Sequence, residues 1–299
     1  DTKATREVAT LPPGEMAVSI NSDETILAGT ITDVSAITNR PFFRFDRNLS
    51  PDQERERKGQ MINRRFHERL PMKLFFLDLK TGKTTTCADG NDWLNHLQFS
   101  PTDPNLLLFC HEGPWQDVDR IWTIHSDGAG LTLVHNRTMV MEIAGHEFWG
   151  PDGQTVWYDL QTPRGEDFWV GGCNLQSKTR TWYHLDRDEW SVHYNVSPDG
   201  QMFCGDGGDE RMVAHATNGK WIYLFRPELV PVASGAMDKP GLIHAGVFQA
   251  ERLVNMARHN YALEPNAMFS PDEKWIIFRS NMSGASQVYE VQINKASSE

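Results

Sequence analysis

Several features that define whole classes of proteins are missing from this sequence. No run of about 18 apolar residues occurs, so no transmembrane helix is predicted, and the start of the chain has neither an initiator Met nor an apolar signal core. Basic residues are outnumbered, with 29 Lys and Arg against 40 Asp and Glu, and the net charge of −11 argues against nucleic acid as the main partner. We therefore expect a soluble mature chain with no membrane and no nucleic-acid partner, from which an upstream signal could have been removed.

Cysteine is also scarce. The 4 cysteines lie far apart in the sequence and form no C-x-x-C pair, which argues against a zinc knuckle and against a dense disulfide frame. We expect buried thiols, which leave the cellular compartment open. They are Cys87, Cys110, Cys173 and Cys204.

Familiar catalytic motifs are absent too. The sequence has no G-x-S-x-G elbow, no G-x-x-x-x-G-K-[ST] loop and no H-E-x-x-H, so serine hydrolase, P-loop and zincin interpretations are excluded. What is present is a composition with 39% hydrophobic and 23% charged residues, which can bury a large core. A length of 299 residues still fits one large all-β domain.

A short phrase of the type Ser/Gly-Pro-Asp recurs along the chain. Each copy is typical of a strand, a tight turn and a second strand, and another hairpin follows most copies, which makes about four strands per repeat. The spacings 150 − 100 = 50 and 197 − 150 = 47 match the ~40–50 residues of one propeller blade. The copies begin at Ser22, Ser100, Gly150, Ser197 and Ser270.

The repeat predicts the fold. We expect an all-β chain, a β-propeller of four-stranded blades with five blades visible, in a single domain over residues 1–299. Because the first residue lies just before a blade already under way, we expect a longer propeller whose first blades are missing; a closed five-bladed ring is the alternative.

A basic insertion at about residues 32–72 interrupts the repeat. Residues 40–69 contain nine Lys and Arg against five Asp and Glu. With Ser50 as N-cap and Pro71 as a stop, we predict a helix over residues 52–70 that lies on one propeller face. The insertion is either a solvated charged segment or a positive rim that guides an acidic ligand.

Polar and aromatic residues gather in four stretches, three of which begin a blade. The first strand of each propeller blade lines the central channel, so residues about 50 positions apart can converge there. This geometry would bring together His146, His193, Glu264 and Asn266. By composition alone, His146 could equally be a histidine that is satisfied between blades.

Several phrases identify a family. In order along the chain they resemble those of the oligogalacturonate lyases, from about Trp93 to Val291. The resemblance implies a seven-bladed propeller, a divalent metal (manganese in the family) in the channel, and β-elimination on short galacturonides. The phrases are Phe109–Pro114, Gly145–Trp149 followed by Pro151-Asp152-Gly153, Cys204–Gly207, Trp221–Phe225 and Phe269–Asp272.

The resemblance also implies roles for single residues. The proton-abstracting histidine of the family falls on His146, an arginine near the substrate on Arg120, and the first metal histidine on His193. Where the family pattern has Gln, His and His as further metal ligands, this chain has Tyr261, Glu264 and Asn266.

We therefore predict His193, Glu264 and Asn266 as the metal ligands of this chain. One nitrogen and two oxygens favour Mn²⁺, Mg²⁺ or Ca²⁺ over Zn²⁺ or Cu²⁺.

Further residues are predicted to bind the acidic oligosaccharide. Arg164, assisted by Arg64 or Arg65 of the insertion, would add positive charge beside Arg120, because a guanidinium can hold both oxygens of a carboxylate. His111 and Trp149 complete the predicted binding residues, and His111 is the second choice as base.

Two other functions compete with the lyase. One is a uronide hydrolase that uses paired carboxylates among Glu147, Glu264 and Asp206. The other is a propeller without catalysis that binds a sugar or a protein. We expect a cytoplasmic location from the family, with the periplasm or export as alternatives.

Overall fold

The computed structural model describes residues 5, 7–32, 50–239 and 241–293, and it divides into two compact units, residues 1–136 and 137–299. Each unit is described by itself below.

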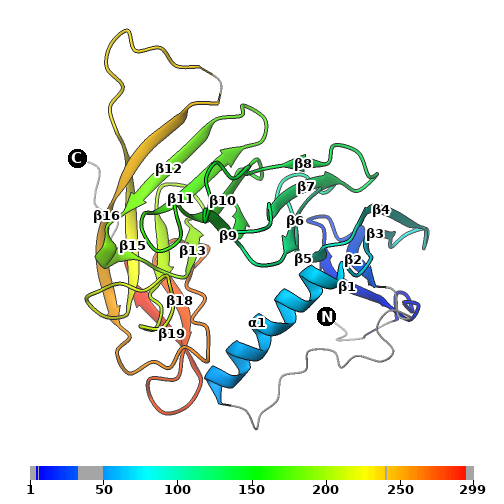
Figure 1. Cartoon of the computed structure of the whole chain (residues 1–299), viewed down its shortest axis with the longest axis horizontal. Coiled ribbons are helices and arrows are strands. Elements are labelled where there is room, and N and C mark those ends of the chain that lie inside the picture. Colours follow the sequence, from blue (N-terminus) through cyan, green and yellow to red (C-terminus); the bar gives the residue numbers. More distant parts are fainter. Residues whose placement is uncertain (1–4, 6, 33–49, 240, 294–299) are drawn as a thin grey trace. The chain divides into compact units, whose positions relative to one another are not determined.

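The first unit contains two antiparallel sheets of four strands each (Figure 1). In both sheets each strand pairs with the next strand of the chain, as in propeller blades. The first sheet consists of β1 (Glu15–Ile20), β2 (Ile26–Thr32), β3 (Met72–Asp78) and β4 (Thr84–Gly90); the second consists of β5 (Trp93–Phe99), β6 (Leu106–Glu112), β7 (Ile121–His125) and β8 (Thr132–Leu133).

The predicted helix is present in the first unit as α1 (Pro51–Glu68). A capping box starts it, because the Ser50 side chain accepts from the Gln53 backbone and the Gln53 side chain accepts from the Ser50 backbone. The helix lies beside β5 (Figure 1), where the Arg65 guanidinium stacks 4.5 Å from the ring of Trp93. Arg64 pairs with Glu68 one turn on. The predicted basic residues Arg40, Arg44 and Arg47 lie outside the described residues.

The second unit holds a sheet of eight strands and a sheet of three. The eight-stranded sheet is two blades whose last strands, β12 and β16, pair in parallel, from Arg180 opposite Ile243 to His184 opposite Val247. The strands are β9 (Ile143–Trp149), β10 (Thr155–Gln161), β11 (Phe168–Asn174), β12 (Arg180–Leu185), β13 (His193–Val196), β14 (Phe203–Asp206), β15 (Trp221–Leu229) and β16 (Ile243–Asn255), then β17 (Met268–Phe269), β18 (Trp275–Ser280) and β19 (Gln287–Gln292); a 3₁₀ turn, η2, spans Arg187–Glu189.

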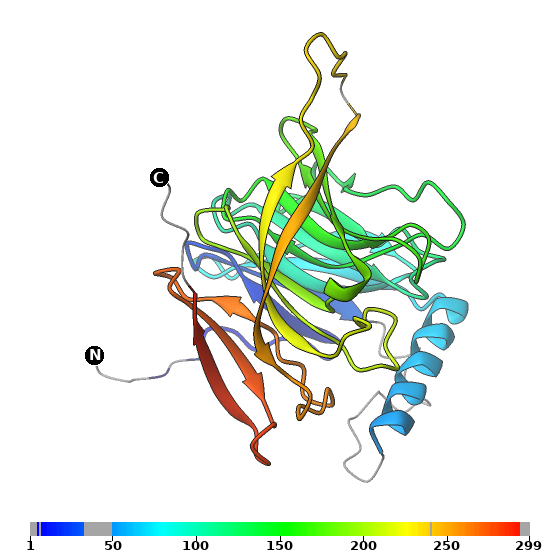
Figure 2. The same cartoon turned by 90° about the vertical axis from the view of Figure 1, so that its left-hand side faces the viewer.

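The long gap between the last two turn phrases is explained by β15 and β16. These strands form an extended hairpin, and β16 alone has 13 residues. Figure 2 shows the hairpin, in yellow and orange, continuing past the strands beside it.

Each unit has its own buried core. Strand residues alternate between buried and more exposed, as in β18, so that one set of side chains packs between neighbouring sheets. The core of the first unit contains Leu74, Phe76, Leu94, Leu97, Phe99, Leu107 and Phe109. An aromatic core in the second contains Phe168, Trp190, Tyr194, Phe203, Tyr223, Phe225, Phe248 and Tyr261.

One backbone hydrogen bond closes the turn between the first two strands of each of the five blades. Its donors and acceptors are Asn21 N to Ile26 O, Ser100 N to Leu106 O, Gly150 N to Thr155 O, Ser197 N to Met202 O and Ser270 N to Trp275 O, at 2.7–3.0 Å. Because this bond recurs, positions in different blades can be matched by counting back from the turn.

The all-β propeller class predicted from the sequence is confirmed. Within the described residues four sheets make up five blades, because the eight-stranded sheet comprises two of them; the described part of the last blade has three strands rather than the predicted four. The single domain over residues 1–299 stays a prediction. No helix within the described ranges is both long and apolar enough to cross a membrane. The four cysteines, all described, form no disulfide.

The turn carboxylate Asp152 provides a test of the repeated turn. Its Oδ1 accepts from the backbone N–H groups of Gln154 and Thr155 at 3.0 and 2.9 Å, and its Oδ2 accepts from the Thr155 hydroxyl at 2.6 Å. Although partial burial opposes the charged form, these bonds hold the pKa of Asp152 below its ordinary value. Asp152→Ala should therefore lower the free energy of unfolding by about 1–2 kcal/mol at neutral pH.

The stabilisation by Asp152 has a defined pH window. A lowered carboxyl pKa stabilises the fold above the unfolded-state pKa of about 3.9, and the stabilisation is lost as the pH falls through the folded-state pKa. In urea unfolding, the difference between wild type and Asp152→Ala should therefore shrink in acid. Asp152→Asn is the control, because it keeps an acceptor oxygen without the titration. A difference that stays constant down into acid contradicts this assignment.

Candidate active site

The candidate histidines occupy one repeated position, which lies four residues before the backbone donor of the turn hydrogen bond in each blade. At this position β5 and β9 each carry one extra residue relative to the next strand, a β-bulge. His96, His146 and Asn266 there have left-handed backbones, with φ of 52°, 45° and 49°. Non-glycine residues rarely adopt this conformation, and it is found where a side chain must be aimed at a site. The five equivalent residues are Ala17, His96, His146, His193 and Asn266.

His146 is held by a carboxylate on the neighbouring strand. Its Nδ1 lies 3.3 Å from Oδ2 of Asp159 on β10. The Asp159 side chain is 3% exposed and that of His146 is 24% exposed, so the carboxylate is buried beneath a ring that solvent can reach. With Nδ1–H donated to Asp159, Nε2 carries the free electron pair of the neutral ring.

His193 repeats this arrangement in the next blade. Its Nδ1 lies 3.3 Å from Oδ2 of Asp206 on β14, and its backbone N–H donates to Oδ1 at 3.1 Å. The Tyr261 hydroxyl donates to Oδ1 at 2.8 Å, and the Asn266 backbone N–H donates to Oδ2 at 2.8 Å. The completely buried Asp206 carboxylate thus binds three residues from two blades.

The charges of this group determine its protonation. Burial opposes the protonated form of His193, but Asp206, with Glu264 and Asp159 further away, outweighs burial and raises the pKa of His193 above its ordinary value. Burial raises the pKa of Tyr261 well above its ordinary value, and the Asp206 charge adds to the effect. The Tyr261 hydroxyl therefore stays protonated and remains a hydrogen-bond donor.

The two histidines lie side by side. The ring centroids of His146 and His193 are 4.7 Å apart, with an interplanar angle of 65°. The structure thus brings together the predicted base and the first predicted metal ligand. Glu264 and Asn266 are both exposed. Two interactions relate them to this pair: the Glu264 charge contributes to the raised pKa of His193, and the Asn266 backbone N–H donates to Asp206.

Arg120 and His111 belong to the first unit. Arg120 is 2% exposed, its Nη1 donates to Glu112, and its guanidinium stacks 4.3 Å from the ring of Trp115. In this arrangement a glutamate, rather than a bound uronate, lies against the guanidinium. His111 Nδ1 contacts Asp92 Oδ2 at 3.1 Å, and its ring stacks on Trp122.

The remaining predicted binding residues lie at the ends of strands in the second unit. Arg164 is exposed in the turn between β10 and β11. Trp149 ends β9, roughly 10 Å along the strand from His146. The binding roles of Arg164 and Trp149 stay predictions.

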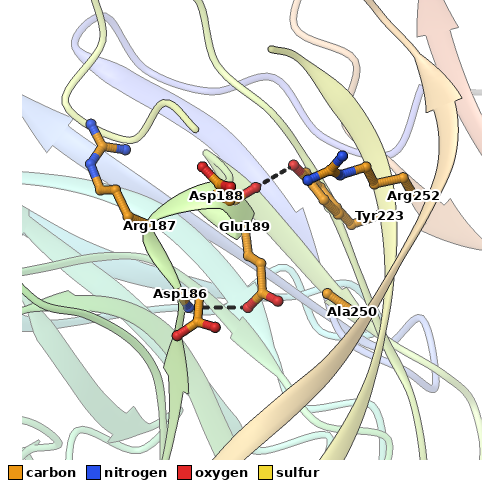
Figure 3. Close-up of a pocket in the computed structure, with 7 residues that line it drawn as sticks. All are labelled: Asp186, Arg187, Asp188, Glu189, Tyr223, Ala250 and Arg252. Carbon is orange, nitrogen blue, oxygen red and sulfur yellow. Dashed lines mark hydrogen bonds between the residues drawn. The ribbon is translucent and has the colours of Figure 1, made fainter. Parts of the chain in front are cut away.

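A cavity of about 770 Å³ lies elsewhere in the second unit, around η2 (Figure 3). The Tyr223 hydroxyl donates to the Asp188 backbone carbonyl there, and Glu189 accepts from the Asp186 backbone. Burial and the neighbouring aspartates raise the pKa of Glu189. The cavity lining has three carboxylates and two guanidiniums, so it is a poor receptor for a polyanion. The lining residues are Asp186, Arg187, Asp188, Glu189, Tyr223, Ala250 and Arg252.

His96 and Asp159 were not singled out from the sequence, and Asp206 was named only as a carboxylate of the hydrolase alternative. His96 stands four residues before Ser100, the same offset as His146 before Gly150, so counting from the turn would have found it. Asp159 and Asp206 each follow their histidine by 13 residues, and that shared spacing is a second unused signal.

The comparisons with known proteins point to one family. The family model described as oligogalacturonate lyase matches residues 61–297. The oligogalacturonate lyase of Dickeya dadantii (strain 3937) is 27% identical over 228 residues, which cover 73% of this chain and 54% of that protein. The oligogalacturonide lyase of Pectobacterium atrosepticum is 28% identical over 228 residues, with the same coverage. The chain spans about half the length of these curated relatives.

Solved structures agree on the fold. An oligogalacturonate lyase in complex with manganese superposes with a TM-score of 0.71 at 22% identity, over 97% of this chain and 69% of that one. The oligogalacturonate lyase from Vibrio parahaemolyticus gives a TM-score of 0.70 at 21% identity, with the same coverage. At these identities the likeness shows the fold alone.

The Asp206 network predicts a strong dependence of stability on one carboxylate. Asp206→Ala leaves buried donors of His193, Tyr261 and Asn266 without their acceptor, so it should lower the free energy of unfolding by about 3–5 kcal/mol. Tyr261→Phe removes one donor and should cost about 1–3 kcal/mol. Urea unfolding measures both. Exposed Glu290→Ala is the control, and an Asp206→Ala loss no larger than that of the control contradicts the prediction.

Proposed function

Because the chain belongs to the oligogalacturonate lyase family, we propose that it cleaves short galacturonate oligosaccharides by β-elimination. The observation that carries the proposal is the pair of histidines His146 and His193, 4.7 Å apart and each anchored by its own buried aspartate. The acidic oligosaccharide as substrate is part of the proposal.

The reaction requires a base and a cation. A base removes the proton from C5 of a uronate, the electron pair of that C–H bond forms the C4–C5 double bond, and the C4–O bond breaks. The leaving oxygen then takes up a proton. The C5 proton is hard to remove because the adjacent carboxylate resists further negative charge, so the site must offset that charge.

His146 is the base of this proposal. Asp159 accepts a hydrogen bond from Nδ1–H, so the basic electron pair is on Nε2 and the ring orientation is fixed. Once Nε2 has taken the C5 proton, the Asp159 carboxylate stabilises the resulting imidazolium. Asp159 acts through His146 and is a positioning residue.

The donor chemistry beside His146 fits a hard divalent cation. A histidine whose Nδ1 is bound by a carboxylate is the usual support for metal ligation through Nε2, and Asp206 provides that support to His193. Glu264 and Asn266 would add oxygen ligands of the kind that Mn²⁺, Mg²⁺ and Ca²⁺ prefer. When bound, such a cation would offset the charge of the substrate carboxylate. The solved relative in complex with manganese supports Mn²⁺ as the first candidate.

The size of this electrostatic effect is sufficient to matter. A unit cation ~4 Å from a carboxylate contributes roughly 4 kcal/mol at an effective dielectric of 20, on the order of a thousandfold in rate if it acts mainly in the transition state. Arg120 stays a proposed substrate ligand, which requires its pair with Glu112 to open.

The hydrolase alternative is disfavoured by Asp206. A general acid or base must reach the substrate, whereas Asp206 is fully buried and accepts four hydrogen bonds. The binding-only alternative predicts no new double bond, so ultraviolet absorbance of the unsaturated product separates it from the lyase. A cytoplasmic location is proposed from the family, and cell fractionation would test it.

His146→Ala tests the base. It should lower turnover by roughly 10²–10⁴-fold, the usual contribution of a positioned base, while substrate affinity and melting temperature change little. The assay follows the double-bond absorbance on galacturonate oligomers. The matched control is His184→Ala, a half-buried histidine on β12. A variant that melts early but keeps its turnover per folded molecule would make His146 structural.

Mn²⁺ addition tests the cation site with a readout independent of turnover. Mn²⁺ should raise the melting temperature of the wild-type chain, because a ligand that binds only the folded state stabilises it. Glu264→Gln should reduce this shift, whereas Glu166→Gln at an exposed turn should not. Chelation should also lower activity. No Mn²⁺-dependent shift together with activity that survives chelation contradicts the metal assignment.

A further inference from the structure

The first unit contains a second set of donors at the repeated position. His96 on β5, with Cys110 and Glu112 on β6, offers a nitrogen, a sulfur and an oxygen that all lie within 4.8 Å of one another. His96 Nε2 is 3.9 Å from Glu112 Oε2. None of these residues is assigned as base, metal ligand or substrate ligand in the reaction proposed above.

The repeat relates this set of three residues to the pair of His146 and Asp159. His96 and His146 both stand four residues before their turn, in a β-bulge and with a left-handed backbone. Opposite them, Cys110 and Asp159 occupy equivalent places, since each lies four residues after the acceptor of the turn hydrogen bond. The blade that contains His96 has therefore exchanged the carboxylate partner for a thiol and carries Glu112 two residues further on.

We propose that His96, Cys110 and Glu112 bind a thiophilic divalent cation, for which Zn²⁺ is the representative. Imidazole, thiolate and carboxylate are its three common protein ligands, and a thiolate favours it over Mn²⁺, Mg²⁺ or Ca²⁺. The donors of a tetrahedral zinc site are about 3.3–3.7 Å apart, so the three groups must close by roughly 1 Å. The fourth position belongs to water.

The surroundings suit this cation. Cys110 is completely buried and Glu112 is 8% exposed, whereas the His96 side chain is 38% exposed and leaves a route for the ion. On binding, the Cys110 thiol releases its proton to solvent and a metal–sulfur bond forms. The thiolate and the Glu112 carboxylate then outweigh the single charge of Arg120, which contacts the other oxygen, Oε1.

Co²⁺ is the probe for this site, because its bond to a thiolate gives a near-ultraviolet charge-transfer band that nitrogen and oxygen ligands do not give. Titration of the whole chain with Co²⁺ should produce this band at one ion per chain, and Zn²⁺ should abolish it. Cys110→Ser should remove the band. Cys204→Ser, a change at another fully buried thiol, should leave it intact.

A second variant guards against misfolding of Cys110→Ser. His96 is exposed enough for His96→Gln to fold, and this change should weaken Co²⁺ binding by more than the roughly 10–100-fold that loss of an outer-shell partner costs. His125→Gln on β7 is its control. The proposal is overturned if wild type shows no thiolate band, if the band survives Cys110→Ser, or if His96→Gln binds Co²⁺ as tightly as wild type.

Discussion

The candidate site of the second unit depends on one carboxylate, Asp206, which has no contact with water. An unpaired charge at the position of Asp206 would cost several kcal/mol, so the fold must surround it with donors. His193, Tyr261 and the Asn266 backbone provide them, and each is thereby held in place. The orientation of the His193 ring follows from the need to satisfy Asp206, and the aromatic core that packs Tyr261 keeps its hydroxyl on the same carboxylate.

The blades reuse one local geometry for different chemistry. The residue four positions before the turn faces the residue four positions after the turn acceptor, and the pair of side chains decides what that blade can do. Asp partners orient the imidazoles of His146 and His193, whereas at His96 a soft sulfur donor, Cys110, takes the place of the carboxylate. One repeated position in the blades therefore carries the proposed base and the histidines of both proposed cation sites.

The sequence predicted the blades better than it predicted the site. Turn and cap chemistry is local, so the Pro-Asp phrases located the strands and the Ser50 cap located the helix without any knowledge of tertiary structure. The partners of His146 and His193 depend on which strand pairs with which, and for His146 also on a bulge that changes the register. Neither is encoded in a short phrase. For the same reason the pair of Arg120 with Glu112 was not predicted from the sequence.

The parallel pairing of β12 with β16 has a consequence for motion. Blades that meet only through side chains can open one at a time, but a continuous ladder of backbone hydrogen bonds joins the blade of β9–β12 to the blade of β13–β16. Amide protons across all eight strands should then exchange with solvent in one cooperative step. His146 and His193 lie on the two blades that this ladder connects. Their 4.7 Å spacing should therefore persist until both blades unfold together, and partial opening of the chain elsewhere should leave it intact.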